Sequence, residues 1–173
     1  VMANQKIVII MGSKSDLPFA QKIERFLQNE GLAVGCEFTV ASAHRIPNIL
    51  LEKLMRYEKS GDKIVFVTIA GLSDALSGVT AGFSMYPVIA CPPDLDSLGW
   101  TKAFSSLATP IGVPVLLASK PENAALAAIK ILALSDRGLQ EEVERYIQKK
   151  RNEVVQADKM IKSDSKSNRR SEL

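Results

Sequence analysis

The sequence is poor in the residues that build disulfide frameworks and metal centres. Its 173 residues include 2 cysteines and 1 histidine. Cys36 and Cys91 stand far apart, each within a run typical of a β-strand. Two scattered cysteines are too few for a disulfide scaffold or for a zinc site. We therefore expect no bound metal, and we expect both cysteines to be small residues of the core.

Long apolar segments and a strong charge of one sign are also missing. No uninterrupted apolar run reaches the roughly 18 residues that a membrane span needs. The first residues lead directly into an apolar strand, without the pattern of a signal peptide. The formal net charge is +3, and many basic residues lie near the C-terminus, not in a stripe interleaved with aromatics. We expect a cytoplasmic protein that binds neither membranes nor nucleic acid.

Short apolar runs alternate with amphipathic segments along the chain, which predicts an α/β fold. A parallel sheet with helices on both faces accounts for this order and for the short connections. The expected strands lie at 6–11, 33–40, 63–70, 86–91 and 113–119. A long amphipathic helix is expected to complete a single domain over residues 1–162. The polar basic tail at 163–173 lacks periodicity, and we expect it to be disordered.

Three polar loops follow the first three expected strands. They read GSKSD at 12–16, SAHRIP at 42–47 and GLSDALSG at 71–78. The carboxyl ends of parallel strands share one edge of a sheet, where ligands bind in α/β proteins. We therefore expect these three loops to meet in one crevice.

The first loop suits an anion. It leads into a helix whose backbone N–H groups favour phosphate, and Ser13 and Ser15 can donate hydrogen bonds. Taken alone, the same residues are explained more simply by ordinary helix capping through Ser15 or Asp16. The loop matches neither the Walker motif nor G-x-G-x-x-G.

His44, the single histidine, lies in the polar exit of the second strand. An imidazole there suits proton transfer near neutral pH, although a lone histidine is often structural. Arg45 can grip a phosphate with its planar fork, or it can be a solvated surface charge. The glycines and serines of the third loop allow close approach of a flat ligand, or form an ordinary connection. Together the loops predict a site for a small phosphorylated molecule with one acid–base group.

The motifs MGSKSD (11–16), SAHR (42–45) and AGLSDALSG (70–78) closely resemble those of the carboxylase family that acts on 5-aminoimidazole ribonucleotide (AIR) in purine biosynthesis. The resemblance covers about residues 6–136. It implies a flavodoxin-like three-layer αβα sandwich with a parallel sheet and a homo-octameric assembly. It also implies that the reaction uses AIR and carbon dioxide as substrates and needs no cofactor.

The resemblance also implies roles for individual residues. His44 matches the histidine that moves the proton of the ring carbon. Ser13 and Asp16 resemble first-loop ligands of the ribose phosphate, and Ser42 and Arg45 resemble those of the second loop. Gly71 and Ser73 would line the imidazole and the carboxylate. The full set of implied substrate-binding residues is Gly12, Ser13, Ser15, Asp16, Ser42, Ala43, Arg45, Gly71, Leu72, Ser73 and Leu76.

Two activities occur in this family, and the third loop separates them. AGLSDALSG resembles the AGRSNALSG of enzymes that carboxylate AIR directly, whereas mutases acting on the N-carboxy compound typically have a GAGGAAHLPG-like loop with a second histidine. Leu72 replaces the usual arginine, Asp74 replaces an asparagine, and Arg45 is the mutase-like choice where direct carboxylases more often have lysine. We expect direct, ATP-independent carboxylation, with the mutase reaction as the alternative.

Two other classes share the expected architecture. A flavodoxin-like FMN protein would hold its flavin between aromatic residues, for which Trp100 and Tyr86 are weak candidates. A receiver domain would need an acidic pair after the first strand and an aspartate at the end of the third. Lys120 is suitably placed for a receiver, but only Asp16 follows the first strand.

The last amphipathic segment, at 138–161, carries an apolar stripe that is longer than a domain of this size has to cover. We expect this helix to pack on a neighbouring subunit.

Overall fold

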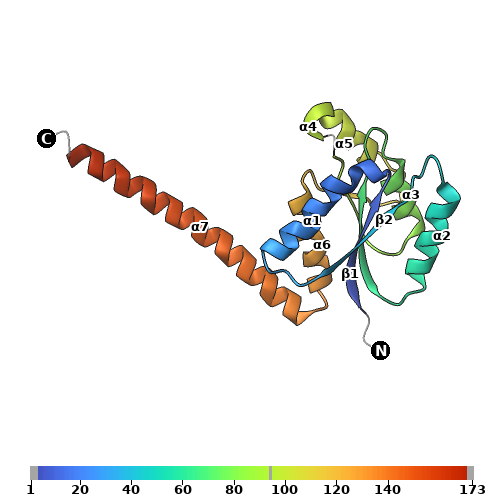
Figure 1. The fold of residues 1–173 in the computed structure, drawn as a ribbon, viewed down its shortest axis with the longest axis horizontal. Coiled ribbons are helices and arrows are strands. Elements are labelled where there is room, and N and C mark those ends of the chain that lie inside the picture. The colour runs from blue at the N-terminus through green and yellow to red at the C-terminus, as the bar shows by residue number, and fades with distance from the viewer. Residues whose placement is uncertain (1–3, 94, 171–173) are drawn as a thin grey trace.

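The protein folds around one parallel sheet, with strand order β2-β1-β3-β4-β5 (Figure 1). The computed structural model describes residues 4–93 and 95–170, without the side chains of residues 96, 98, 100 and 164–170. This order is the flavodoxin-like one, and it confirms the expected α/β class and three-layer architecture. The strands are β1 (Gln5–Met11), β2 (Gly35–Val40), β3 (Lys63–Ile69), β4 (Val88–Ala90) and β5 (Leu116–Leu117).

Helices cover both faces of the sheet. On one face α1, α6 and the first turns of α7 pack against the strands, and α2 and α3 cover the other. A short 3-10 helix, η1 (Lys14–Asp16), precedes α1. The α-helices are α1 (Leu17–Asn29), α2 (Pro47–Glu58), α3 (Ala75–Phe83), α4 (Leu95–Leu98), α5 (Trp100–Leu107), α6 (Pro121–Ala133) and α7 (Arg137–Arg170).

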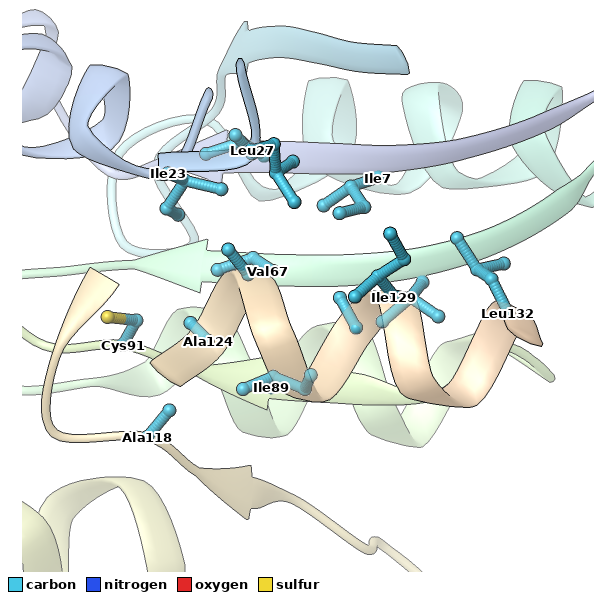
Figure 2. Close-up of a cluster of buried hydrophobic side chains, with 14 of the residues drawn as sticks. Ile7, Ile23, Leu27, Val67, Ile89, Cys91, Ala118, Ala124, Ile129 and Leu132 are labelled. Atoms are coloured by element: carbon cyan, nitrogen blue, oxygen red, sulfur yellow. The ribbon is translucent and has the colours of Figure 1, made fainter. Parts of the chain in front are cut away.

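The alternation of side chains along the strands separates the core into two layers. In β1, Ile7 and Ile9 point to the layer formed with α1 and α6, whereas Val8 and Ile10 point to the layer formed with α2 and α3. Strand residues alternate faces, so a strand covered on both sides reads as a continuous apolar run. Figure 2 shows the first layer, in which Ile129 of α6 lies over the sheet.

The last two strands are shorter than the sequence pattern predicts. Proline has no backbone N–H to donate to a sheet ladder. Pro87 precedes β4, and Pro114 lies in the stretch that was expected to form the fifth strand. β5 is therefore reduced to two residues at the edge of the sheet, where Leu116 is half exposed.

The cysteines occupy the places expected for core residues. Cys91 is buried after β4 and Cys36 is half-buried in β2. Burial raises the pKa of each thiol to about 12, so both are protonated at neutral pH and are poor nucleophiles. In the part of the chain that the structure describes, no helix has the length and apolar content of a membrane span.

The final helix leaves the domain after its first turns. Leu139 and Val143 are buried, and Tyr146 packs edge-on against Phe26 of α1 with ring centroids 5.7 Å apart. Beyond them α7 projects away from the sheet (Figure 1), and Val154 is 71% exposed. The helix continues to Arg170, past the expected end near residue 162, because each added residue extends a helix that is already nucleated.

The projecting part of α7 keeps an apolar stripe. Ile147, Val154 and Ile161 recur at heptad spacing, the pattern of a helix that packs on another helix.

We predict that Val154→Asp with Val155→Asp lowers the molecular mass in solution, because two carboxylates in the stripe oppose its burial. Light scattering coupled to size exclusion measures the mass. Asn152→Asp with Gln156→Asp adds the same charge beside the stripe and is the matched control. An unchanged mass in the first variant would contradict the predicted role of α7.

Candidate functional site

The three polar loops meet because the central strands end at the same level. Met11 pairs with Val40 of β2 and with Ile69 of β3, so each of these strands ends at one line across the sheet. The N–H of Gly12 then donates to the carbonyl of Ile69 at 2.8 Å, and the N–H of Ala41 donates to that of Met11 at 2.9 Å. The sheet register thus brings together residues 12–16, 41–46 and 70–74.

A cavity of about 390 Å³ opens between these loops. Small-molecule sites usually measure about 300–1,000 Å³, so this volume suits a ligand such as a mononucleotide. Every residue that the sequence predicted for the site lies on its wall, and Ala70 joins them from the start of the third loop. The lining residues are Gly12, Ser13, Ser15, Asp16, Ser42, Ala43, His44, Arg45, Ala70, Gly71, Leu72, Ser73 and Leu76.

The first loop is stiffened by a capping box. The carboxylate of Asp16 accepts from the N–H of Ser13 at 3.0 Å, and the hydroxyl of Ser13 accepts from the N–H and the hydroxyl of Ser15 at 3.3 and 2.9 Å. Asp16 precedes α1 but makes no side-chain cap bond to that helix. The Asp16 carboxylate therefore bonds to the backbone of the first loop and does not cap α1. The amino terminus of α1, which carries a partial positive charge, lies beside the cavity.

The second loop turns around Ser42. Its hydroxyl accepts from the N–H of Arg45 at 3.2 Å, and its carbonyl accepts from the N–H of Ile46 at 3.0 Å. The turn places His44 and Arg45 on the cavity wall with exposed side chains. Both side chains are therefore open to the cavity and to solvent.

The third loop is fixed by hydrogen bonds to a buried carboxylate. Asp74 is buried, and its carboxylate accepts from the N–H of Ser77 at 3.0 Å and from the hydroxyls of Ser77 and Ser106 at 2.5 and 2.6 Å. It is the N-cap of α3. Leu72 has a φ of 54° and is 76% exposed at the cavity, and Leu76 is buried beneath the wall.

The chemistry of the wall is that of a site for a polar anion with one proton-transfer group. Arg45 and the amino terminus of α1 favour negative charge, and Asp16 with the serines can hydrogen-bond to hydroxyl groups. His44 supplies the titratable group. Among the side chains that the structure describes, no three His, Cys, Asp or Glu residues group together as a metal centre would require.

Two residues weighed for other functions, Tyr86 and Lys120, lie outside the wall of this cavity. The hydroxyl of Tyr86 donates to the carbonyl of Asp62 at 2.9 Å, just before β3, at the opposite end of the sheet. Lys120 precedes α6 as its N-cap residue. The side chain of Trp100 lies outside the described residues. Neither Tyr86 nor Lys120 contributes to the cavity wall.

Sequence reasoning missed the support that α5 gives to the third loop. Lys102, Ser105 and Ser106 of this helix hydrogen-bond to residues 72 and 74. Their spacing places them on one face of a helix, which is a signal that the sequence carries. The residues that this face contacts lie about thirty positions away in the chain, and no sequence pattern identifies them.

Comparison with known proteins finds one family, whose members are named for two activities. Residues 6–153 match the family model described as AIR carboxylase. The chain is 45% identical over 157 residues to the phosphoribosylaminoimidazole carboxylase of Archaeoglobus fulgidus, covering 91% of this chain and 85% of that one. It is 40% identical over 158 residues to the N5-carboxyaminoimidazole ribonucleotide mutase of Methanocaldococcus jannaschii, covering 90% and 97%.

The fold gives the same match. The crystal structure of Treponema denticola PurE superposes with a TM-score of 0.86 at 34% sequence identity, covering 92% of this chain and 99% of that one. Fold and sequence thus agree over the part of the chain that carries the three loops.

The exposed guanidinium of Arg45 gives the first test of the site. We predict that Arg45→Ala weakens binding of ribose 5-phosphate about 10- to 100-fold, because a hydrogen bond to a charged group contributes about 1.5–3 kcal/mol. Isothermal titration calorimetry measures the dissociation constant. Arg56→Ala removes an exposed arginine of α2 outside the cavity and is the control. Equal affinities in both variants would remove Arg45 from the phosphate site.

Proposed function

The chain belongs to the AIR carboxylase family of purine biosynthesis, and from this premise we propose that it carboxylates AIR directly with carbon dioxide, without ATP. The observation that supports this activity most is the third loop. AGLSDALSG has no histidine and is similar to the corresponding loop of the direct carboxylases, so that His44 is the one imidazole available to the site.

In this proposal the first two loops hold the nucleotide. Arg45 and the amino terminus of α1 bind the phosphate, with Ser13 and Ser42 as hydroxyl partners. Asp16 accepts hydrogen bonds from ribose hydroxyls. The base then extends toward the third loop, whose glycine and serine backbone allows close approach of a flat ring.

The proposed reaction needs one acid–base group. The electron pair of the ring carbon forms a bond to carbon dioxide, and one C=O electron pair moves to oxygen to give a carboxylate. The ring carbon then carries both the carboxylate and its original proton. His44 removes that proton, the electrons of the C–H bond restore the aromatic ring, and the proton passes from His44 to water. Holding both reactants in contact and excluding water supply much of the remaining rate.

The mutase reaction is the second candidate. It is favoured by Arg45, which is the mutase-like residue at this position, and by the likeness to a protein named as a mutase. The same residues would hold the N-carboxy compound, and the same proton would leave the ring carbon. The two candidates differ in whether free carbon dioxide or the N-carboxy group supplies the carboxylate.

A paired assay separates the two candidates. We predict that AIR is consumed in the presence of carbon dioxide without ATP, at a rate that rises with carbon dioxide concentration. The N-carboxy compound should be used only as fast as it decomposes to AIR, which a blank without enzyme measures. Conversion of the N-carboxy compound faster than this blank, with no dependence on added carbon dioxide, would identify the mutase. No turnover of either substrate would reject the proposed function.

The role of His44 is tested by His44→Asn. We predict that turnover falls by at least about 100-fold, because asparagine cannot take up the proton and general acid–base catalysis contributes about 100- to 10,000-fold. Nucleotide affinity should change little, since loops one and two hold the phosphate and ribose. Single-turnover kinetics and calorimetry with AIR measure the two effects separately. Substantial residual turnover would remove His44 from the proton transfer.

We also propose that the protein assembles as a homo-octamer, as the family resemblance implies, and that it acts in the cytoplasm. The exposed apolar stripe of α7 supports self-association, because Val154, Val155 and Ile161 are each at least half exposed in the single chain. Burial of such a stripe between subunits would stabilise the assembly by the hydrophobic effect.

A further inference from the structure

One face of α5 is bonded to the third loop of the site. The ammonium group of Lys102 donates to the carbonyl of Leu72, the hydroxyl of Ser105 accepts from the N–H of Asp74 at 2.6 Å, and the hydroxyl of Ser106 donates to the carboxylate of Asp74 at 2.6 Å. Lys102 is 3% exposed and Ser106 is fully buried. A lysine so deeply buried is uncommon, since its charge must be compensated by hydrogen bonds or other charges.

The loop that these bonds hold has an unfavourable backbone conformation. Leu72 has a φ of 54°, in the left-handed region, where the Cβ of a leucine clashes with its own backbone. Such conformations persist only where neighbouring contacts hold them, and they gather at functional sites. The side chain of Leu72 is 76% exposed, so packing of that side chain does not hold the conformation. The bond from Lys102 holds the carbonyl of Leu72 itself, and the bonds to Asp74 hold the chain two residues later.

The bond from Lys102 sets the direction of the next N–H group. The structure has no cis peptide bond in its described part, and in a trans peptide the C=O and the following N–H point in opposite directions. The carbonyl of Leu72 points to Lys102, so the N–H of Ser73 points away from α5. Leu72 and Ser73 line the cavity and Lys102 does not, which places the loop between the helix and the cavity.

We propose that Lys102 is a positioning residue that aims the N–H of Ser73 at the carboxylate formed in the reaction. This inference rests on the proposed function, in either its carboxylase or its mutase form, because both reactions place a carboxylate on the ring carbon. A preorganised N–H group stabilises negative charge as it develops on oxygen. The proposed role fits Leu72 in the place of the arginine usual in direct carboxylases, since a backbone donor would then meet the negative charge and not the side chain at position 72.

The decisive variant is Lys102→Met, which keeps most of the side-chain volume and removes the donor. Loss of one donor to a developing oxyanion lowers turnover about 100- to 1,000-fold, and misdirection of that donor should lower kcat at least tenfold. KM for AIR should stay within about twofold, because residues 12–16 and 42–45 hold the nucleotide. Lys130→Met, an exposed lysine of α6, is the matched control and should keep wild-type kcat.

A second substitution separates positioning from folding. Glycine adopts a positive φ without the clash of a Cβ, so Leu72→Gly in the Lys102→Met background should recover part of the lost kcat. A general loss of folding would not be repaired in this way. Ser105→Ala removes the bond to the N–H of Asp74 and should lower kcat less than Lys102→Met. It tests the same face of α5 if Lys102→Met does not fold.

Hydrogen exchange gives a readout that does not depend on activity. Lys102→Met should speed exchange of the backbone amides of residues 70–76, while residues 12–16 keep wild-type rates. The ratios of kcat and KM between variant and wild type are measured with whichever substrate the wild-type enzyme converts. If it converts neither, the proposed function fails, and the exchange data alone decide whether Lys102 holds the loop. Two results would overturn the inference. One is a wild-type kcat in Lys102→Met together with unchanged hydrogen exchange, and the other is a loss of kcat that Leu72→Gly does not reduce.

Discussion

The site depends on one constraint, which is that β1, β2 and β3 end at the same level of the sheet. Met11 is paired on one side with Val40 and on the other with Ile69, and the parallel register carries all three chains to the same edge. From β1 the chain passes to β2 on one side and later to β3 on the other, so the loops after β1 and β3 diverge and leave a crevice. A shift of one residue in this register would exchange the faces of every side chain in a strand.

The loops keep their shape through hydrogen bonds that begin or end on the backbone. In the first loop Ser13 and Asp16 cap each other, in the second Ser42 accepts from Arg45, and in the third Asp74 accepts from Ser77. Polar groups that find partners in this way fix one geometry, and where they are buried, as Asp74 is, their burial costs little. If the donors of a site are already oriented, no free energy is needed to reorient them when charge develops on a ligand. The same bonds that fold the loops therefore fix the direction of their donors before any ligand binds.

The sequence predicted the parts of this structure that are encoded locally. Continuous apolar runs indicated the buried strands, and the polar residues after three of them indicated the loops that line the cavity. The shortening of β5 was not predicted, although Pro114 is a local signal against a sheet ladder. The bonds from α5 to Leu72 and Asp74 were not predicted because they join segments about thirty residues apart, and no periodicity marks such pairs. The direction of α7 depends equally on tertiary contacts, with Tyr146 against Phe26 where the helix leaves the domain.

The distribution of charge on the cavity wall bears on how a direct carboxylase can work with leucine at position 72. If Arg45 and the amino terminus of α1 neutralise the phosphate, the carboxylate at the far end of the ligand must find other donors. Carbon dioxide itself is uncharged, so a fixed cation near it gains little before the new bond forms. A backbone N–H aimed at the developing oxygen acts mainly in the transition state, which is where stabilisation raises kcat. In the proposed arrangement the loop above α5 would meet this requirement without a cationic side chain at position 72, so a leucine there would be compatible with carboxylation.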